Sequence, residues 1–127
     1  MFLHTLDPGR DAGILYRNRL DWLEDRLGDS GEIYPFLHHP LCDIGDPDLD
    51  TINLANANDL AALFRRHCNV RQIFFGHVHR TIFLSRHGIP CASLDNLGAD
   101  SSPVLTPAIS LLARCGEGVT SAVRPLA

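Results

Sequence analysis

Val70-Arg71-Gln72-Ile73-Phe74-Phe75 is a short apolar run that leads directly into Gly76-His77-Val78-His79-Arg80. Its length and its β-branched and aromatic side chains predict a buried strand that ends at Gly76. In extended backbone, alternate side chains point the same way. We therefore expect the imidazoles of His77 and His79 to converge on one site at the end of this strand.

A second pair of histidines follows another predicted strand. The segment 32–38 is mostly apolar, and its end overlaps the motif Phe36-Leu37-His38-His39-Pro40. A helix is predicted between the two strands, over 54–67. The carboxyl ends of parallel strands joined by a helix share one edge of a sheet, where open α/β sheets bind ligands. His38 or His39 should therefore meet the other pair there. Neutral imidazole binds zinc, iron and manganese alike, so the pattern predicts a metal site without naming the metal.

The rest of the chain completes a single α/β domain over residues 1–127, with no linker or internal repeat. A strand is predicted at 1–6, and an amphipathic helix follows Gly13, because Tyr16, Leu20, Leu23 and Leu27 recur at helical spacing. Hairpins are predicted at 81–93 and 108–123. The segment 41–53 contains four aspartates and reads as a surface loop near the site.

Composition excludes several classes of function. Eleven Lys and Arg against fifteen Asp and Glu give a formal charge of −4, which argues against nucleic acid as a partner. No apolar run is long enough to cross a membrane, and the first residues lack the features of a signal peptide. The four cysteines are more than twenty residues apart and form no C-x-x-C motif. We expect a cytoplasmic protein with reduced cysteines.

Together with Asp7-Pro8-Gly9, Arg19-Leu20-Asp21-Trp22-Leu23 and Gly88-Ile89-Pro90, the two histidine blocks resemble the calcineurin-like metallophosphoesterases. The nearest branch is the bacterial cyclic-nucleotide and glycerophosphodiester phosphodiesterases, and the resemblance covers about residues 3–92. It implies part of a β-sandwich: one mixed sheet, two helices on one face and C-terminal hairpins. It also implies a two-metal hydrolase, in which Mn, Fe or Zn ions activate a water that attacks the phosphorus of a small phosphoester.

The resemblance assigns metal ligands residue by residue. His38 and His77 match ligands of the second metal, and His79 matches a ligand of the first. His39 would orient a ligand or contact substrate, although the roles of His38 and His39 could be exchanged. Arg80 could bind a phosphate oxygen, with a surface ion pair as the alternative.

The sequence departs from the family in one important respect. The Asp-x-His, Gly-Asp-x-x-Asp and Gly-Asn-His-Asp/Glu blocks, which supply the other ligands and the acid for the leaving group, do not occur here. The chain therefore resembles the C-terminal portion of such an enzyme, with the N-terminal metal-binding half absent, and we expect it to be inactive alone. The alternatives are a non-enzymatic metal-binding or dimerisation module and a small enzyme that uses one metal.

An oligomer is a further expectation from the strands. Their apolar side chains lie on both faces, whereas the two predicted helices can cover only one. An uncovered apolar face larger than a few hundred Å² favours association. We therefore expect a homo-oligomer built on that face.

Overall fold

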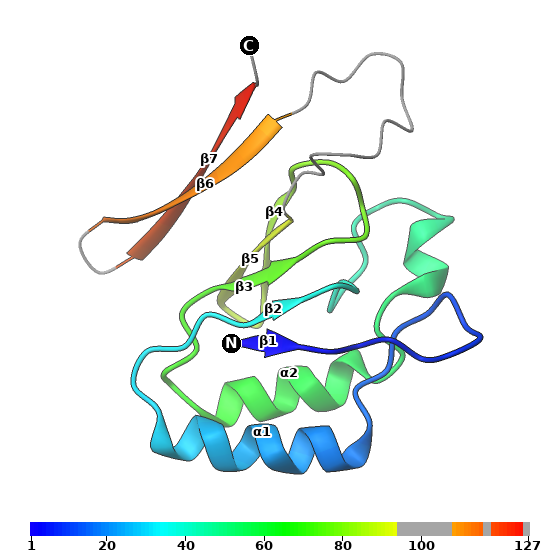
Figure 1. The fold of residues 1–127 in the computed structure, drawn as a ribbon, viewed down its shortest axis with the longest axis vertical. Coiled ribbons are helices and arrows are strands. Elements are labelled where there is room, and N and C mark those ends of the chain that lie inside the picture. The colour runs from blue at the N-terminus through cyan, green and yellow to red at the C-terminus, as the bar shows by residue number, and fades with distance from the viewer. Residues whose placement is uncertain (94–107, 116–117, 126–127) are drawn as a thin grey trace.

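The computed structural model describes residues 1–93, 108–115 and 118–125. Its main element is a five-stranded sheet, which is mixed because four strands are parallel and one edge strand is antiparallel to its neighbour (Figure 1). In spatial order the strands are β1 (Phe2–Leu3), β2 (Phe36–Leu37), β3 (Ile73–Phe75), β5 (Ile89–Ser93) and the antiparallel β4 (Phe83–Arg86).

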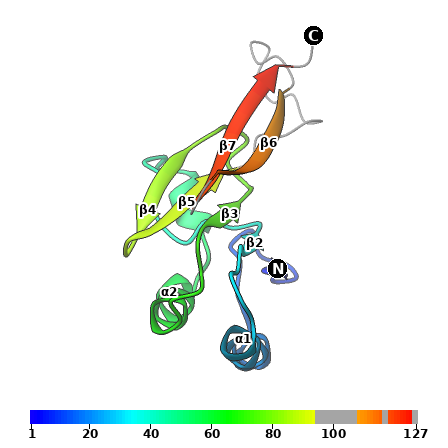
Figure 2. The ribbon, with the colours of Figure 1, turned by 90° about the vertical axis from the view of Figure 1, so that its left-hand side faces the viewer.

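Both α-helices lie on the same face of this sheet, as Figure 2 shows. Helix α1 (Arg17–Asp29) follows β1, and helix α2 (Ala57–Arg66) follows the short 3-10 helix η1 (Leu49–Ile52). Their apolar stripes pack against the strand residues that point toward them. The buried members include Leu23, Leu27, Leu60, Phe64, Leu37, Ile73 and Phe75. Full burial of each such side chain stabilises the fold by about 1.5–3 kcal/mol.

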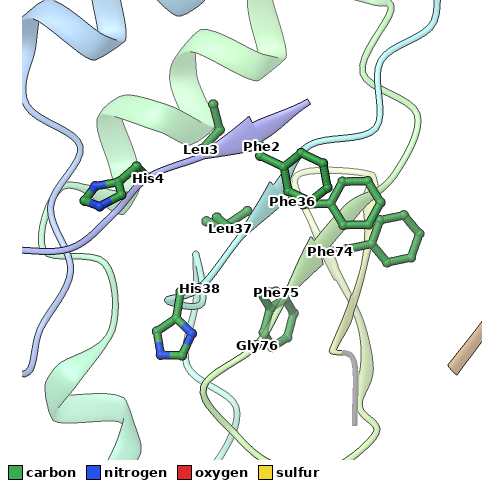
Figure 3. Close-up of a pocket in the computed structure, with 9 residues that line it drawn as sticks. All are labelled: Phe2, Leu3, His4, Phe36, Leu37, His38, Phe74, Phe75 and Gly76. Atoms are coloured by element: carbon green, nitrogen blue, oxygen red, sulfur yellow. The ribbon is translucent and has the colours of Figure 1, made fainter. Parts of the chain in front are cut away.

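The other face of the sheet carries a row of apolar side chains that crosses all five strands. Strand register aligns Phe2, Phe36, Phe74, Ala92 and Phe83, and we call these residues the aromatic row. The first three rings are stacked, with centroids 5.1 and 4.9 Å apart (Figure 3). The centre of the row is covered, since Phe74 is 1% exposed, whereas Phe2 and Phe83 at its ends are 84% and 60% exposed.

Beyond the five-stranded sheet, β6 (Ala108–Cys115) and β7 (Gly118–Pro125) pair as an antiparallel hairpin. Figure 2 shows this hairpin on the side of the sheet away from the helices. The predicted α/β layout is therefore confirmed, with one mixed sheet, two helices on one face and C-terminal hairpins. Within the described residues, neither helix has the length and apolar character needed to span a membrane.

Candidate metal centre

Two histidines meet at the carboxyl ends of β2 and β3. The register pairs Leu37 with Phe75, so His38 and Gly76 are the next residues on adjacent parallel strands. The Gly76 N–H donates to the carbonyl oxygens of Leu37 and His38, at 3.2 and 3.1 Å. A Cβ at Gly76 would already contact the His38 ring at 3.4 Å. This close approach brings His77 Nδ1 to 3.2 Å from His38 Nε2.

The spacing of these two nitrogens suits a shared metal ion. Zn–N bonds of about 2.0–2.1 Å at tetrahedral angles place two ligand nitrogens about 3.3–3.4 Å apart. The observed 3.2 Å is close to that separation. In addition, His77 Nε2 is buried and has no hydrogen-bond partner within the described residues. A metal ion held by this pair would replace the hydrogen bond between the two rings, and the Nε2 of His77 has no further partner to lose.

His39 lies in the same cluster but is used differently. Ligand atoms of His38, His39 and His77 lie within 4.8 Å of one another. The His39 ring is buried, with Nδ1 2.8 Å from the Thr5 hydroxyl and Nε2 3.0 Å from the Asp11 carbonyl oxygen. A carbonyl oxygen only accepts, so Nε2 carries the proton and Nδ1 accepts from Thr5. Both ring nitrogens are then occupied, which makes His39 a poor ligand and a good anchor for the loop after β1.

His79 lies beside the cluster rather than in it. It is exposed and is not among the ligand atoms that gather within 4.8 Å. Its charge nevertheless lowers the pKa of both His38 and His77, so it lies within electrostatic range of each. The backbone here is a turn, not the extended chain that the sequence predicted. His77 and His79 have φ values of 70° and 48°, and the Val78 N–H donates to the Gly76 carbonyl.

The electrostatics of the cluster favour neutral imidazoles. Burial is the main cause that lowers the pKa of His38, His39 and His77 below the ordinary value of 6.5. Repulsion among the neighbouring rings lowers these pKa values further, because protonating one ring disfavours protonating the next. The Asp11 carboxylate acts in the opposite direction on His77. Neutral rings are the form that binds a metal.

Arg80 makes the ion pair that the sequence left as an alternative to phosphate binding. Its Nη2 lies 3.5 Å from Asp46 Oδ2, and both side chains are partly exposed. Asp46 belongs to a tight loop that Asp50 organises by accepting hydrogen bonds from the N–H groups of Ile44, Gly45 and Asp46. These bonds lower the pKa of Asp50. An exposed pair at this distance contributes about 0–1 kcal/mol, so Arg80 can leave Asp46 at little cost.

Four residues around the cluster carried no recognisable signal in the sequence. Thr5 and Asp11 hold the ring of His39, Gly13 packs against that ring, and buried Ser93 bonds the segment after His79. All four are single small or polar residues far from the histidine blocks. Only the fold brings them together.

The three cysteines whose side chains the structure describes take no part in the histidine cluster. Cys42, Cys68 and Cys91 are free thiols that are half-buried, exposed and buried, respectively. Burial raises the pKa of Cys91 to about 12, so its thiol stays protonated and unreactive. The side chain of Cys115 lies outside the described residues.

Comparisons of sequence find relatives that are phosphodiesterases. A probable cyclic nucleotide phosphodiesterase of Synechococcus sp. (strain ATCC 27144) is 35% identical over 85 residues, which is 66% of this chain and 33% of that protein. The glycerophosphodiester phosphodiesterase GpdQ of Enterobacter lignolyticus is 35% identical over 62% of this chain and 29% of its own length. The cyclic AMP phosphodiesterase CpdA of Haemophilus influenzae is 36% identical over 58% and 28%.

Other comparisons add little. No family model matches the chain. A solved Vps29 mutant of Entamoeba histolytica aligns with 99% of the chain, but at 14% identity and a TM-score of 0.32 it carries no weight. The curated relatives are therefore the evidence for kinship. The chain is related by sequence to the calcineurin-like metallophosphoesterases, through bacterial cyclic-nucleotide and glycerophosphodiester phosphodiesterases, and spans about a third of the length of those relatives.

Proposed function

We propose that this chain binds a divalent metal ion through His38, His77 and His79 and forms part of a metal-dependent phosphodiesterase site. The observation that carries the proposal is the 3.2 Å approach of His77 to His38 at adjacent strand ends. Kinship with phosphodiesterases, over about a third of their length, supports the reaction class. The substrate would be a small phosphodiester, such as a cyclic nucleotide or a glycerophosphodiester.

Each residue of the centre would have a distinct task. His38 and His77 would hold one ion between the strand ends, and exposed His79 would bind from the solvent side. His39 would keep the loop that carries Thr5 and Asp11 against the cluster. Arg80, released from Asp46, would reach a phosphate oxygen. A bound metal ion would supply an activated water and stabilise charge on the phosphoryl oxygens.

The proposed site is incomplete within the described residues. A two-metal site needs a carboxylate between its ions. No carboxylate joins the histidine cluster in the part of the chain that the structure describes. We therefore propose that further ligands come from outside the described residues. We also propose that the reaction takes place in the cytoplasm, where the free thiols would persist. A non-enzymatic metal-binding or dimerisation module is the alternative, favoured by the exposed ends of the aromatic row.

Titration calorimetry with zinc tests the metal proposal. At pH 7.5 the wild-type chain should bind one ion, and His77→Ala should weaken binding by at least about 10-fold, because it removes one of the paired nitrogens. His67→Ala is the matched control, since it removes an imidazole at the end of α2 and should change the affinity less than about twofold. Equal binding by wild type and His77→Ala would exclude the site.

The same titration, repeated at several pH values, tests how zinc affinity changes with pH. Burial lowers the pKa of His38 and His77, so both rings stay neutral to a lower pH than ordinary histidines. Zinc affinity should therefore be almost constant between pH 8 and 7 and should fall steeply only below the ordinary histidine pKa of 6.5. A steady decline that begins above pH 7 would indicate ligands with unshifted pKa values.

Hydrolysis of bis-p-nitrophenyl phosphate with excess manganese tests whether the isolated chain is itself an enzyme or only supplies metal ligands. The purified chain should be no faster than His79→Ala, because the carboxylate and the leaving-group acid are not in the cluster. His67→Ala again serves as the control for nonspecific effects. Turnover that depends on His79 would contradict the need for outside ligands and would favour an enzyme that uses one metal.

A further inference from the structure

Ser93 ends β5 beside the histidines without touching them. It pairs in register with Phe75, the last residue of β3, and it is 2% exposed. Its hydroxyl donates to the Arg80 carbonyl oxygen and accepts from the Ile82 N–H at 2.6 Å. Its own N–H donates to the Ile82 carbonyl at 2.9 Å. Three hydrogen bonds thus fasten residues 80–82 to the end of β5.

The fastened segment is the exit of the turn that carries His77 and His79. At the entry of this turn, the N–H of Gly76 is bonded to the carbonyls of Leu37 and His38. Between entry and exit, both histidines adopt the left-handed conformation that non-glycine residues disfavour. Such a conformation persists only where the surroundings hold it. At the exit, the hydroxyl of Ser93 is the side-chain group that does so.

We infer that Ser93 is a positioning residue of the metal centre, whose hydroxyl holds the turn so that His79 stays beside His38 and His77. The inference rests on the proposed metal binding by these three histidines. Ser93 acts through the backbone: its bond to the Arg80 carbonyl restrains the peptide that follows His79. Without the hydroxyl, the exit of the turn loses two of its three bonds, and His79 can relax away from its neighbours.

Thr81 supplies a matched control for this role. It lies in the same segment, between the two residues that Ser93 bonds. Its hydroxyl is buried but makes no hydrogen bond within the described residues. Thr81→Val therefore removes a hydroxyl from the same place without removing a restraint on the turn.

The test is zinc titration calorimetry of the 127-residue chain at pH 7.5, with circular dichroism to confirm folding. Ser93→Ala should weaken zinc binding about 10-fold, the low end of the effect expected when a group that orients a ligand is lost. Ser93→Thr keeps the hydroxyl and should bind within about threefold of wild type, while Thr81→Val should stay within about twofold. If Ser93→Ala does not fold, Ser93→Cys replaces it under the same criterion, since a thiol is only a weak hydrogen-bonding group.

The outcomes separate this inference from the proposed function. Zinc binding that depends on His77 but is unchanged in Ser93→Ala would overturn the positioning role alone. Equal losses in Ser93→Ala and Ser93→Thr, or in Ser93→Ala and Thr81→Val, would also overturn it, because the hydroxyl would not be the cause. If the wild-type chain binds no zinc, the proposed metal site itself fails.

Discussion

Two adjacent histidines, His38 and His39, are equivalent in the sequence and different in the structure. His38 is exposed and shares its Nε2 with His77, whereas His39 is buried with both nitrogens bonded to the loop after β1. Both residues follow the end of β2, and their ring centroids are only 4.8 Å apart, so the difference comes from the hydrogen-bond partners that each ring finds. His38 Nε2 faces His77 Nδ1, whereas the ring nitrogens of His39 face Thr5 and Asp11. The exchange of roles that the sequence left open is therefore disfavoured by the hydrogen bonds of His39.

Gly13→Ala tests the anchoring role of His39. A Cβ at Gly13 would lie 2.3 Å from His39 Nδ1 and 2.4 Å from its Cγ, so the ring would have to move and lose its bonds to Thr5 and Asp11. We expect the free energy of unfolding, measured by urea denaturation, to fall by about 1–3 kcal/mol. In a His39→Ala background the same change should cost much less, because the clashing ring is gone.

Gly28→Ala is the matched control for that measurement. Gly28 lies within α1, and a Cβ there would meet nothing within 4 Å. Alanine is the better helix former, so this variant should gain about 0.5–1 kcal/mol. A Gly13→Ala variant as stable as wild type would show that His39 is not tightly held.

At the scale of the elements, periodicity predicted the helices and the order of the strands. The leucine spacing that predicted the first helix also predicted its buried side, because Leu23 and Leu27 are the buried residues of α1. The two hairpins lie where turn residues and alternation placed them. These features depend on residues within a few positions of one another, so the local sequence is sufficient to predict them.

The boundaries were wrong where distant residues or proline decide them. The strand expected at 32–38 is divided, because Pro35 has no N–H for the ladder; Ile33 forms only an isolated bridge, and β2 begins at Phe36. Glycine commonly ends a helix, so the sequence favours an end of the first helix at Gly28. Helix α1 instead continues to Asp29, and the Asn69 side chain donates to the carbonyls of Leu27, Ser30 and Gly31 at its end. Asn69 is 42 residues from Leu27, so the sequence around the helix end does not reveal this cap.

The candidate site also combines a feature that the sequence predicted with one that depends on distant residues. The meeting of His38 with His77 followed from the rule that parallel strand ends share an edge, and the structure brings these rings together. The left-handed turn did not follow, because the sequence pattern of His77 and His79 also suits extended backbone. The turn depends on the bond that the Gly76 N–H donates to the Leu37 carbonyl and on the bond that the Ser93 hydroxyl donates to the Arg80 carbonyl, and only the assembled sheet brings these groups together.

At the scale of the whole molecule, the sheet has one face packed by helices and one that is partly open. The open ends of the aromatic row belong to Phe2 and Phe83, on the two edge strands. A phenylalanine side chain offers roughly 200 Å² of apolar surface, so their exposed fractions amount to about 300 Å². Burying this surface against a second copy would contribute about 7 kcal/mol per chain at 25 cal/mol per Å². The loss of translational and rotational freedom on association opposes it by about 4–15 kcal/mol.

These magnitudes predict weak self-association through the aromatic row. Light scattering should give a mass above the 14.0 kDa of the chain that rises with concentration in the micromolar range. Replacing both phenylalanines, Phe2→Ser with Phe83→Ser, should restore a monomer, because it removes the exposed apolar surface from both ends of the row. Trp22→Ser is the control: this side chain is 46% exposed on α1, so the variant loses an exposed aromatic group from the opposite side of the sheet and should still associate. A wild-type chain that stays monomeric at every concentration and binds no hydrophobic dye would contradict the prediction, since the row would then be covered by the chain itself.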